Sequence, residues 1–130
     1  VGDGISSKAK EVGRLAIQVD VNLDEQQPGN VLTSVLKLTN VPAETFVKAL
    51  LDGTLDKLDN LQTFGIGSKA TDITDLSVIE RFGVDKDAWA AIKAKVEAKR
   101  QAIASGSLKV VNVQVGEKFD PALYPNVVMK

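Results

Sequence analysis

The stretch Ala16-Ile-Gln-Val-Asp20-Val-Asn22, together with Gly29-Asn-Val-Leu-Thr-Ser34-Val-Leu-Lys37, decides the fold. Residues 15–21 and 31–36 are compact apolar runs with many β-branched side chains, a composition typical of buried strands. The polar segment 22–30 between them contains a proline and predicts a connecting loop. One acid, Asp20, therefore ends the first predicted strand, and one base, Lys37, ends the second.

The spacing of apolar residues predicts three helices around these strands: one ahead of Gly13, one from Pro42 to Gly53, and one from Asp85 to Gly106. Their apolar stripes are Ile5, Ala9 and Val12 in the first, Phe46, Val47, Leu50 and Leu51 in the second, and Trp89, Ile92, Val96 and Ile103 in the third. We expect the third stripe to pack in the core. Two further strands are predicted at 61–67 and 108–115.

Helices that alternate with continuous apolar strands favour the α/β class, with a mainly parallel sheet flanked by helices. The predicted elements occupy residues 1–115, and residues 116–130 are interpreted as an irregular tail. The chain has 130 residues, 44% of them hydrophobic, which is enough for one domain with its own core. No apolar run approaches the about 18 residues needed to span a membrane.

Composition excludes several classes of function. The chain has no Cys and no His, so thiolate zinc sites, imidazole-activated nucleophiles and HExxH metal helices are impossible. With a net charge of −1, interspersed charges and 5% aromatic residues, it lacks the basic stripe and stacking surface of a nucleic-acid binder. We expect no enzyme activity, no cofactor, no metal and no nucleic-acid partner.

Asp20 is the first candidate for a binding residue, because ligands of α/β sheets collect beyond the carboxyl ends of strands. The alternative is a turn-forming Asp that accepts hydrogen bonds from nearby backbone amides. The segment from Asp20 to Asp24 imitates the start of a calcium loop, yet Glu25 and Val31 stand where the glycine and the bidentate glutamate belong. The charged residues of 93–100 are interpreted as a solvated helix face.

The order of several short segments resembles the basic membrane protein family of solute-binding lipoproteins, which includes purine nucleoside receptors of bacterial ABC transporters. The segments are Gly2-Asp3-Gly4, Lys8-Ala9-Lys10-Glu11-Val12-Gly13, Val19-Asp20, Val31-Leu32-Thr33-Ser34-Val35-Leu36-Lys37, Leu51-Asp52-Gly53-Thr54, Phe64-Gly65-Ile66 and Ser105-Gly106-Ser107-Leu108-Lys109-Val110. They extend over about residues 1–110, and the run that ends at Lys37 is the most specific of them.

The resemblance implies the carboxyl-terminal portion of a type I periplasmic-binding-protein fold, in which two α/β lobes close on a ligand by a hinge motion. It gives Asp20 and Lys37 ligand-contacting roles. An ionised carboxylate only accepts hydrogen bonds, so Asp20 suits the neighbouring hydroxyls of a ribose, and Lys37 balances its charge. Gly2 and Gly4 would let the backbone approach the base.

The expected function is therefore the substrate-binding component of an ABC transporter that captures a nucleoside or a related small polar solute. Its expected partners are that ligand, the missing amino-terminal lobe or a second chain, and a transporter permease. The expected location is extracytoplasmic, anchored to the membrane through a missing amino-terminal segment. Two alternatives remain: a ligand-free interaction or scaffold domain, and a ligand-sensing regulatory module.

Overall fold

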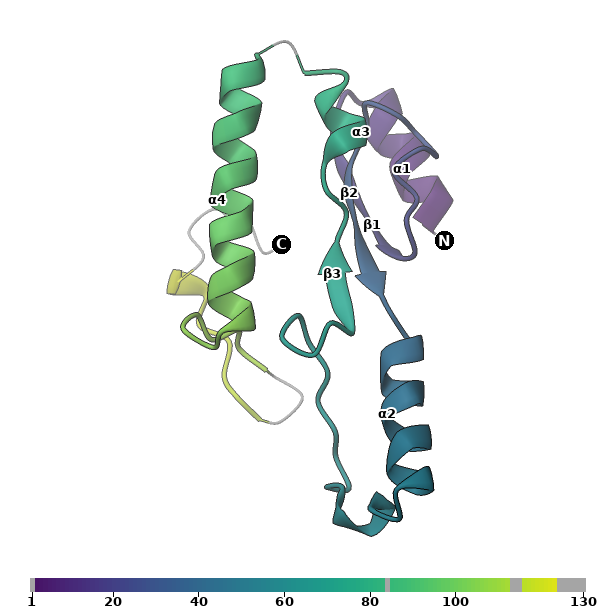
Figure 1. Cartoon of the computed structure of the whole chain (residues 1–130). Coiled ribbons are helices and arrows are strands. Elements are labelled where there is room, and N and C mark those ends of the chain that lie inside the picture. The colour runs from purple at the N-terminus through teal and green to yellow at the C-terminus, as the bar shows by residue number, and fades with distance from the viewer. Residues whose placement is uncertain (1, 84, 113–115, 124–130) are drawn as a thin grey trace.

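The computed structural model describes residues 2–83, 85–112 and 116–123 (Figure 1). Its elements in chain order are α1 (Gly2–Glu11), β1 (Ala16–Asp20), β2 (Val31–Lys37), α2 (Asn40–Leu51), the 3-10 helix η1 (Leu55–Lys57), β3 (Thr71–Ile73), α3 (Ser77–Glu80), α4 (Lys86–Ala104) and the 3-10 helix η3 (Pro121–Leu123). The expected α/β class is confirmed. The predicted irregular tail covers residues 116–130. Its described part, 116–123, contains the short η3, and residues 124–130 lie outside the described ranges.

The three strands form one sheet in the order β1-β2-β3. β1 and β2 are parallel, with Ile17 opposite Thr33 and Asp20 opposite Leu36, whereas β2 and β3 are antiparallel. The expectation of a mainly parallel sheet is therefore met by one strand pair only, and the sheet is mixed. After β2 the chain leaves the sheet through α2 and η1, and it returns beside β2 in the opposite direction as β3.

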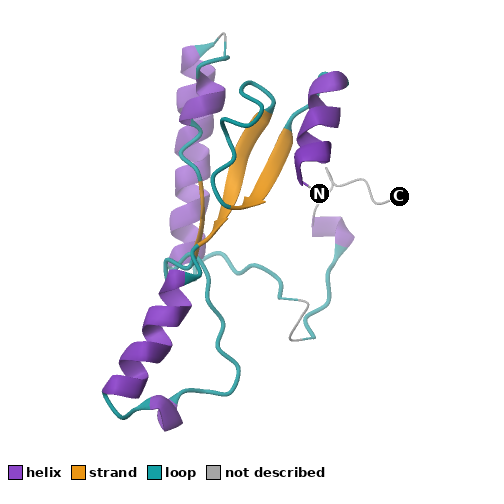
Figure 2. Ribbon diagram, turned by 90° about the vertical axis from the view of Figure 1, so that its right-hand side faces the viewer, coloured by secondary structure: helices purple, strands orange, loops and turns teal. Residues whose placement is uncertain are grey.

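Helices lie on both sides of the sheet: in Figure 2, α1 lies nearer the viewer, beside β1, and α4 lies behind the strands. α1 approaches β1 through small side chains, because Ser6 is fully buried and a Cβ on Gly2 would come within 2.8 Å of the Gln18 side chain. The predicted apolar stripe does not make this contact: Ile5 and Val12 are 60% and 53% exposed. The helix is predicted correctly, and small side chains rather than its apolar stripe face the sheet.

Helix ends follow the sequence signals closely. Gly53 adopts a φ of +64°, and the amide of Thr54 donates to the carbonyl of Ala49, which closes α2 with its orphan carbonyls satisfied. At the start of α4, the Asp85 carboxylate accepts a hydrogen bond of 2.9 Å from the Ala88 amide. Both predicted boundaries are confirmed.

The predicted strand at 61–67 is wrong. Two glycines interrupt this run, and the Ser68 hydroxyl both accepts from the Gly65 amide and donates to the Gly65 carbonyl, which makes a turn. The third strand is instead the short segment Thr71–Ile73. No strand forms in 108–112, and residues 113–115 of that prediction lie outside the described ranges.

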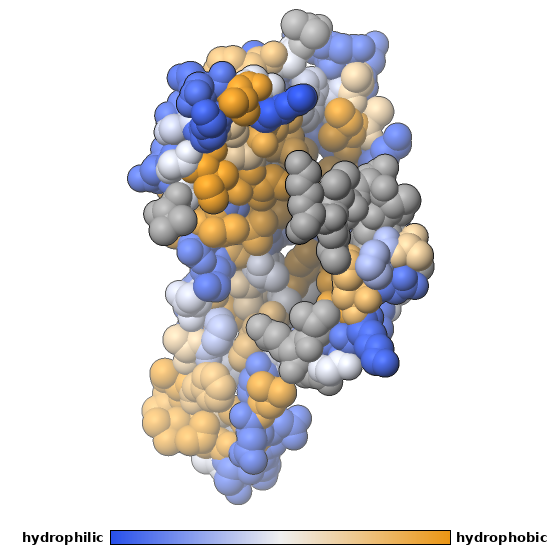
Figure 3. All heavy atoms as spheres, turned by 180° about the vertical axis from the view of Figure 1, so that it is seen from behind, coloured by the Kyte–Doolittle hydropathy of each residue, from blue (hydrophilic) through white to orange (hydrophobic). Residues whose placement is uncertain are grey.

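The core is small for a chain of this length. Among the described residues the buried apolar side chains are Ala16, Val31, Ala49, Ala70, Leu76 and Ile79. Large apolar side chains remain exposed, and in Figure 3 they gather over the end of the molecule where α2 lies. No residue of α4 is buried, so the expected core packing of its stripe is also wrong. None of the helices in the described ranges is both long and apolar enough to cross a membrane.

Candidate functional site

A groove of about 580 Å³ opens at the carboxyl ends of β1 and β2. Its walls are Val19, Asp20, Val35, Leu36, Lys37, Leu38, Thr39, Pro42, Phe64, Ala70 and Thr71. They come from the last residues of two parallel strands, the start of α2 and the approach to β3. Because both strands end here, the groove lies at the edge of the sheet where the sequence predicted a ligand site.

The groove brings together Asp20 and Lys37. The register places Asp20 opposite Leu36, so Lys37 follows one residue later, and its Nζ lies 3.2 Å from Asp20 Oδ1. Both side chains are open to solvent, at 63% and 70% exposed. This exposure leaves the second carboxylate oxygen and the remaining ammonium protons accessible to a ligand.

Asp20 leaves the strand with a φ of +78°, a left-handed conformation that Asp and Asn adopt more readily than other residues with a side chain. The turn-forming alternative for Asp20 requires hydrogen bonds from nearby amides to its carboxylate. Within the described ranges the contact recorded for this carboxylate is the one with Lys37. Its geometry therefore fits a residue that faces the groove better than a residue locked to the backbone.

Hydrogen bonds between β2 and β3 fix the far wall of the groove. The Leu38 amide donates to the Ala70 carbonyl at 2.8 Å, and the Thr71 hydroxyl donates to the Leu36 carbonyl at 2.8 Å. Phe64 is oriented by an edge contact with Phe46 of α2, with ring centroids 6.4 Å apart. One end of the groove is thus charged, and the rest of its wall is mainly apolar with one aromatic ring.

The other two predicted site residues lie elsewhere. The Gly2 carbonyl accepts a hydrogen bond of 3.2 Å from the Gln18 side chain, and a Cβ on Gly4 would meet nothing within 4 Å. Neither glycine lines the groove. The structure therefore brings together Asp20 and Lys37 of the four predicted residues, and it gives Gly2 a packing contact with β1.

The loop that imitates a calcium site is held by its own hydrogen bonds. The Asn22 side chain accepts from the Asp24 amide at 3.0 Å, and Ser34 of β2 donates to the Asp24 carboxylate at 2.5 Å. Asp24 is 2% exposed. In the described ranges no group of three or more acidic residues could hold a metal ion. These side chains pin the loop 22–30 to the sheet.

Sequence reasoning missed two parts of the site region. Phe64 and Thr71 line the groove, but neither was predicted as a site residue. Phe64 was placed only in the predicted strand at 61–67, and Thr71 belongs to the antiparallel strand β3, which the pattern did not predict. The charged face of α4 is also not simply solvated. Arg100 donates to both carboxylate oxygens of Asp72 and holds the pKa of Asp72 below its ordinary value. Likewise the Glu80 carboxylate raises the pKa of Lys93.

Comparison of the chain with protein-family models gives no match, and comparison with curated proteins gives none either. The resemblance to the basic membrane protein family stays a prediction, and function is argued from the groove itself.

Proposed function

We propose that this chain is part of a solute-binding protein, and that the groove beside Asp20 and Lys37 binds a ribonucleoside. The observation that carries the proposal is the accessible carboxylate and ammonium, 3.2 Å apart, at the shared carboxyl end of two parallel strands. The volume of about 580 Å³ falls in the usual range of small-ligand sites, about 300–1,000 Å³.

In the proposed complex Asp20 accepts hydrogen bonds from the two neighbouring ribose hydroxyls. Such a bond to a charged group contributes about 1.5–3 kcal/mol. Lys37 donates to the ligand and keeps the site electrically balanced, which lowers the cost of enclosing a carboxylate. The base lies against the apolar wall, where Phe64 supplies an aromatic surface. This arrangement binds and orients a solute and requires no chemical step.

The size of the exposed surface supports a larger assembly around this chain. Its accessible surface is 9812 Å² at 13.9 kDa, whereas a folded monomer of that mass exposes about 6,700 Å². This excess of about 3,000 Å² on one chain is larger than the about 800 Å² per partner of a standard interface. We propose that a missing amino-terminal lobe, or a second chain, covers this surface and completes a type I periplasmic-binding-protein fold.

The same proposal places the protein in the basic membrane protein family, outside the cytoplasm and anchored to the membrane by a segment that precedes Val1. A transporter permease would receive the captured solute. The open groove supports this role, because a site that must release its ligand to another protein needs an exposed entrance.

Isothermal titration calorimetry with adenosine, 2′-deoxyadenosine and free ribose tests the proposed binding. We expect saturable binding of adenosine, and affinity for the deoxynucleoside about 10- to 100-fold lower because one hydroxyl is lost. Asp20→Asn and Lys37→Met should weaken adenosine binding. The controls are Glu11→Gln and Lys8→Met, which break an ion pair of similar exposure on α1. Equal affinity for the two nucleosides contradicts the proposal.

A second function is favoured by the same apolar surface: an interaction domain that binds a partner protein and no ligand. The exposed side chains of α2 support it, among them Leu50 and Leu51 at 63% and 79% exposed. This alternative predicts no heat of binding with any of the three ligands. It also predicts that Asp20→Asn leaves the affinity for the partner protein unchanged.

A further inference from the structure

Apart from the groove beside Asp20, two neighbouring hollows lie between α4 and β3. This helix of 19 residues has no buried residue, and its recorded side-chain links to the described sheet and α3 are ion pairs: Arg100 with Asp72, and Lys93 with Glu80. A helix that is held by ion pairs rather than by close packing leaves its apolar side chains available. The space between α4 and β3 is therefore a candidate site in its own right.

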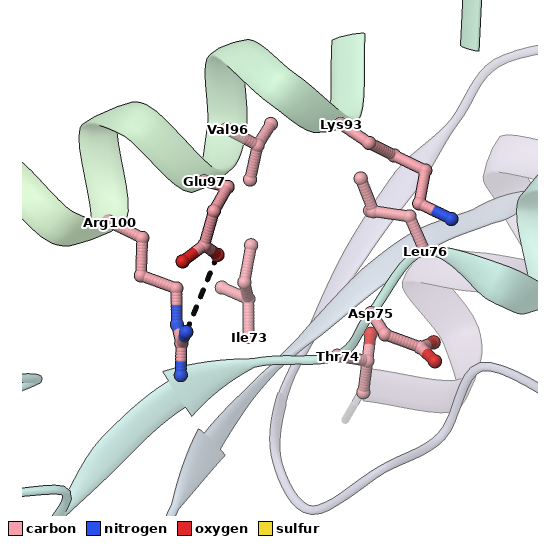
Figure 4. Close-up of a pocket in the computed structure, with 8 residues that line it drawn as sticks. All are labelled: Ile73, Thr74, Asp75, Leu76, Lys93, Val96, Glu97 and Arg100. Atoms are coloured by element: carbon pink, nitrogen blue, oxygen red, sulfur yellow. Dashed lines mark hydrogen bonds and ion pairs between the residues drawn. The ribbon is translucent and has the colours of Figure 1, made fainter. Parts of the chain in front are cut away.

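Apolar side chains face each other across this space. Val96 of α4 and Ile73 of β3 point toward one another, as Figure 4 shows. On one side of this pair the hollow is bordered by Asp75, Leu76, Lys93 and Glu97. On the other side a second hollow of about 340 Å³ is bordered by Ile66, Ile103, Lys95 and Lys99. We call this second hollow the α4 groove, and its floor is the apolar set Ile66, Ile73, Val96 and Ile103.

The cations at the α4 groove are not equivalent. Arg100 already donates to both oxygens of Asp72, and its NH1 lies 3.4 Å from Glu97. In contrast, Lys95 and Lys99 have neither a hydrogen bond nor an ion pair with any residue of the described ranges. They are four residues apart and therefore lie on one face of the helix. Two uncompensated positive charges thus border an apolar floor.

We propose that the α4 groove binds an amphipathic anion: an unbranched apolar chain that ends in a carboxylate. The chain lies on Ile73, Val96 and Ile103, and the carboxylate reaches the ammonium groups of Lys95 and Lys99. The volume of about 340 Å³ suits a medium-chain fatty acid. A membrane surface is a poorer occupant, because Val96 faces β3 rather than outward.

This site is separate from the proposed nucleoside site. The α4 groove and the groove beside Asp20 share no lining residue. Binding of an amphipathic anion therefore does not depend on the nucleoside proposal, and each can fail alone.

Isothermal titration calorimetry with decanoate and with decyltrimethylammonium, both below their micelle concentrations, tests the proposal. The two probes have the same apolar chain and opposite charge. We expect saturable binding of decanoate and at least 10-fold weaker binding of the cation. Octanoate should bind about 10-fold more weakly than decanoate, because each buried CH₂ changes affinity about three- to fourfold. Equal binding of the two charged probes would overturn the proposal.

Variants distinguish this groove from the other exposed apolar surfaces. Lys95→Gln combined with Lys99→Gln should weaken decanoate binding at least 10-fold. The matched control is Lys86→Gln, a lysine at the far end of the same helix. A second variant, Ile103→Asn, should also weaken binding, whereas Asp20→Asn should not. If the double lysine variant binds decanoate as the unaltered chain does, the assignment to the α4 groove is wrong.

Discussion

At the scale of single residues, the pair of Asp20 and Lys37 matters for ligand chemistry more than for stability. An exposed ion pair contributes about 0–1 kcal/mol, because water screens it and two long side chains must be ordered. The backbone of Asp20 makes a stronger demand, since its φ of +78° tolerates few residues with a side chain. One position therefore carries two separable requirements, a left-handed turn and a negative charge.

Asp20→Asn and Asp20→Val separate these two requirements. Asn tolerates the left-handed region, so we expect its free energy of unfolding to stay within about 1 kcal/mol of the unaltered chain. A β-branched residue is strained there, and Asp20→Val should cost about 1–3 kcal/mol. Urea denaturation followed by circular dichroism measures both. Equal stability of the two variants would show that the turn does not depend on this residue.

The pair of Asp72 and Arg100 predicts a pH dependence of stability. Arg100 lowers the pKa of Asp72 in the folded protein, so the carboxylate binds protons more readily in the unfolded chain. Its stabilising contribution is complete above the unfolded pKa of about 3.9 and is lost as the pH falls through the lower folded pKa. Above about pH 5 the unaltered chain should be more stable than Asp72→Asn by a constant amount.

Below about pH 4 this difference should shrink, because the carboxylate becomes protonated and the ion pair is lost. Urea denaturation between pH 2.5 and pH 7, in steps chosen around the expected transition of about pH 4, measures it. The control is Asp59→Asn, whose side chain has no recorded contact in the described ranges. A difference that persists unchanged at the lowest pH would contradict this role for Asp72.

At the scale of elements, the sheet is fixed by a polar contact at the centre of β2. The Ser34 hydroxyl accepts from the Leu23 amide at 3.0 Å and donates to the Asp24 carboxylate. Ser34 is fully buried and Asp24 is 2% exposed. Because the loop 22–30 sets the register between β1 and β2, this contact also supports the meeting of Asp20 and Lys37.

Ser34→Ala should therefore destabilise the protein more than a serine substitution usually does. It leaves a buried carboxylate without its donor, which costs about 1–3 kcal/mol. The matched control is Ser7→Ala on the exposed side of α1, where we expect a change within about 0.5 kcal/mol. Urea denaturation of the two variants measures both. If Ser34→Ala lowers the free energy of unfolding as little as Ser7→Ala does, the loop 22–30 does not set the register between β1 and β2.

The sequence predicted the elements with strong local signals. The strands β1 and β2, the ends of α2 and α4, and the position of Asp20 and Lys37 at strand ends all follow from apolar runs and capping residues. The strand β3 could not be predicted, because three residues without an apolar run pair only through tertiary contacts. For the same reason Thr71 was not recognised as a groove residue, whereas Phe64 was assigned to a strand at 61–67 that does not form.

The buried faces of helices were the least predictable feature. In α1 the apolar stripe leaves Ile5 and Val12 exposed, and Ser6 and Gly2 make the contact with the sheet. In α4 no residue of the stripe is buried, and two of its members, Val96 and Ile103, line an open groove rather than a core. An apolar stripe indicates that one face of a helix is to be buried. It does not indicate whether that face packs against the same chain or against another molecule.

At the scale of the whole molecule, the exposed apolar surface is the dominant fact. α2 carries Phe46, Val47, Leu50 and Leu51 in the open, and its recorded contacts with other elements are mainly with η1. Monomeric soluble proteins rarely expose a continuous apolar patch of this kind. The surface is therefore expected to be buried by further protein in the complete assembly.

The isolated chain should consequently associate with itself through α2. Leu50→Gln should lower this association, because it places a polar group on the apolar face. The matched control is Lys48→Gln, which introduces the same side chain at a position that already carries an exposed polar group. Sedimentation velocity over a range of concentrations measures the effect. A chain that remains monomeric at every concentration would contradict the inference that this face needs a cover.

The central claim is that a ribonucleoside binds in the groove at the carboxyl ends of β1 and β2. Nuclear magnetic resonance tests it most directly, by titrating adenosine into the ¹⁵N-labelled chain and following each assigned backbone amide. The account predicts saturable shifts concentrated at residues 19–20, 35–39, 64 and 70–71, and their loss in Asp20→Asn. Shifts confined to other surfaces, or no shifts at saturating adenosine, would contradict it.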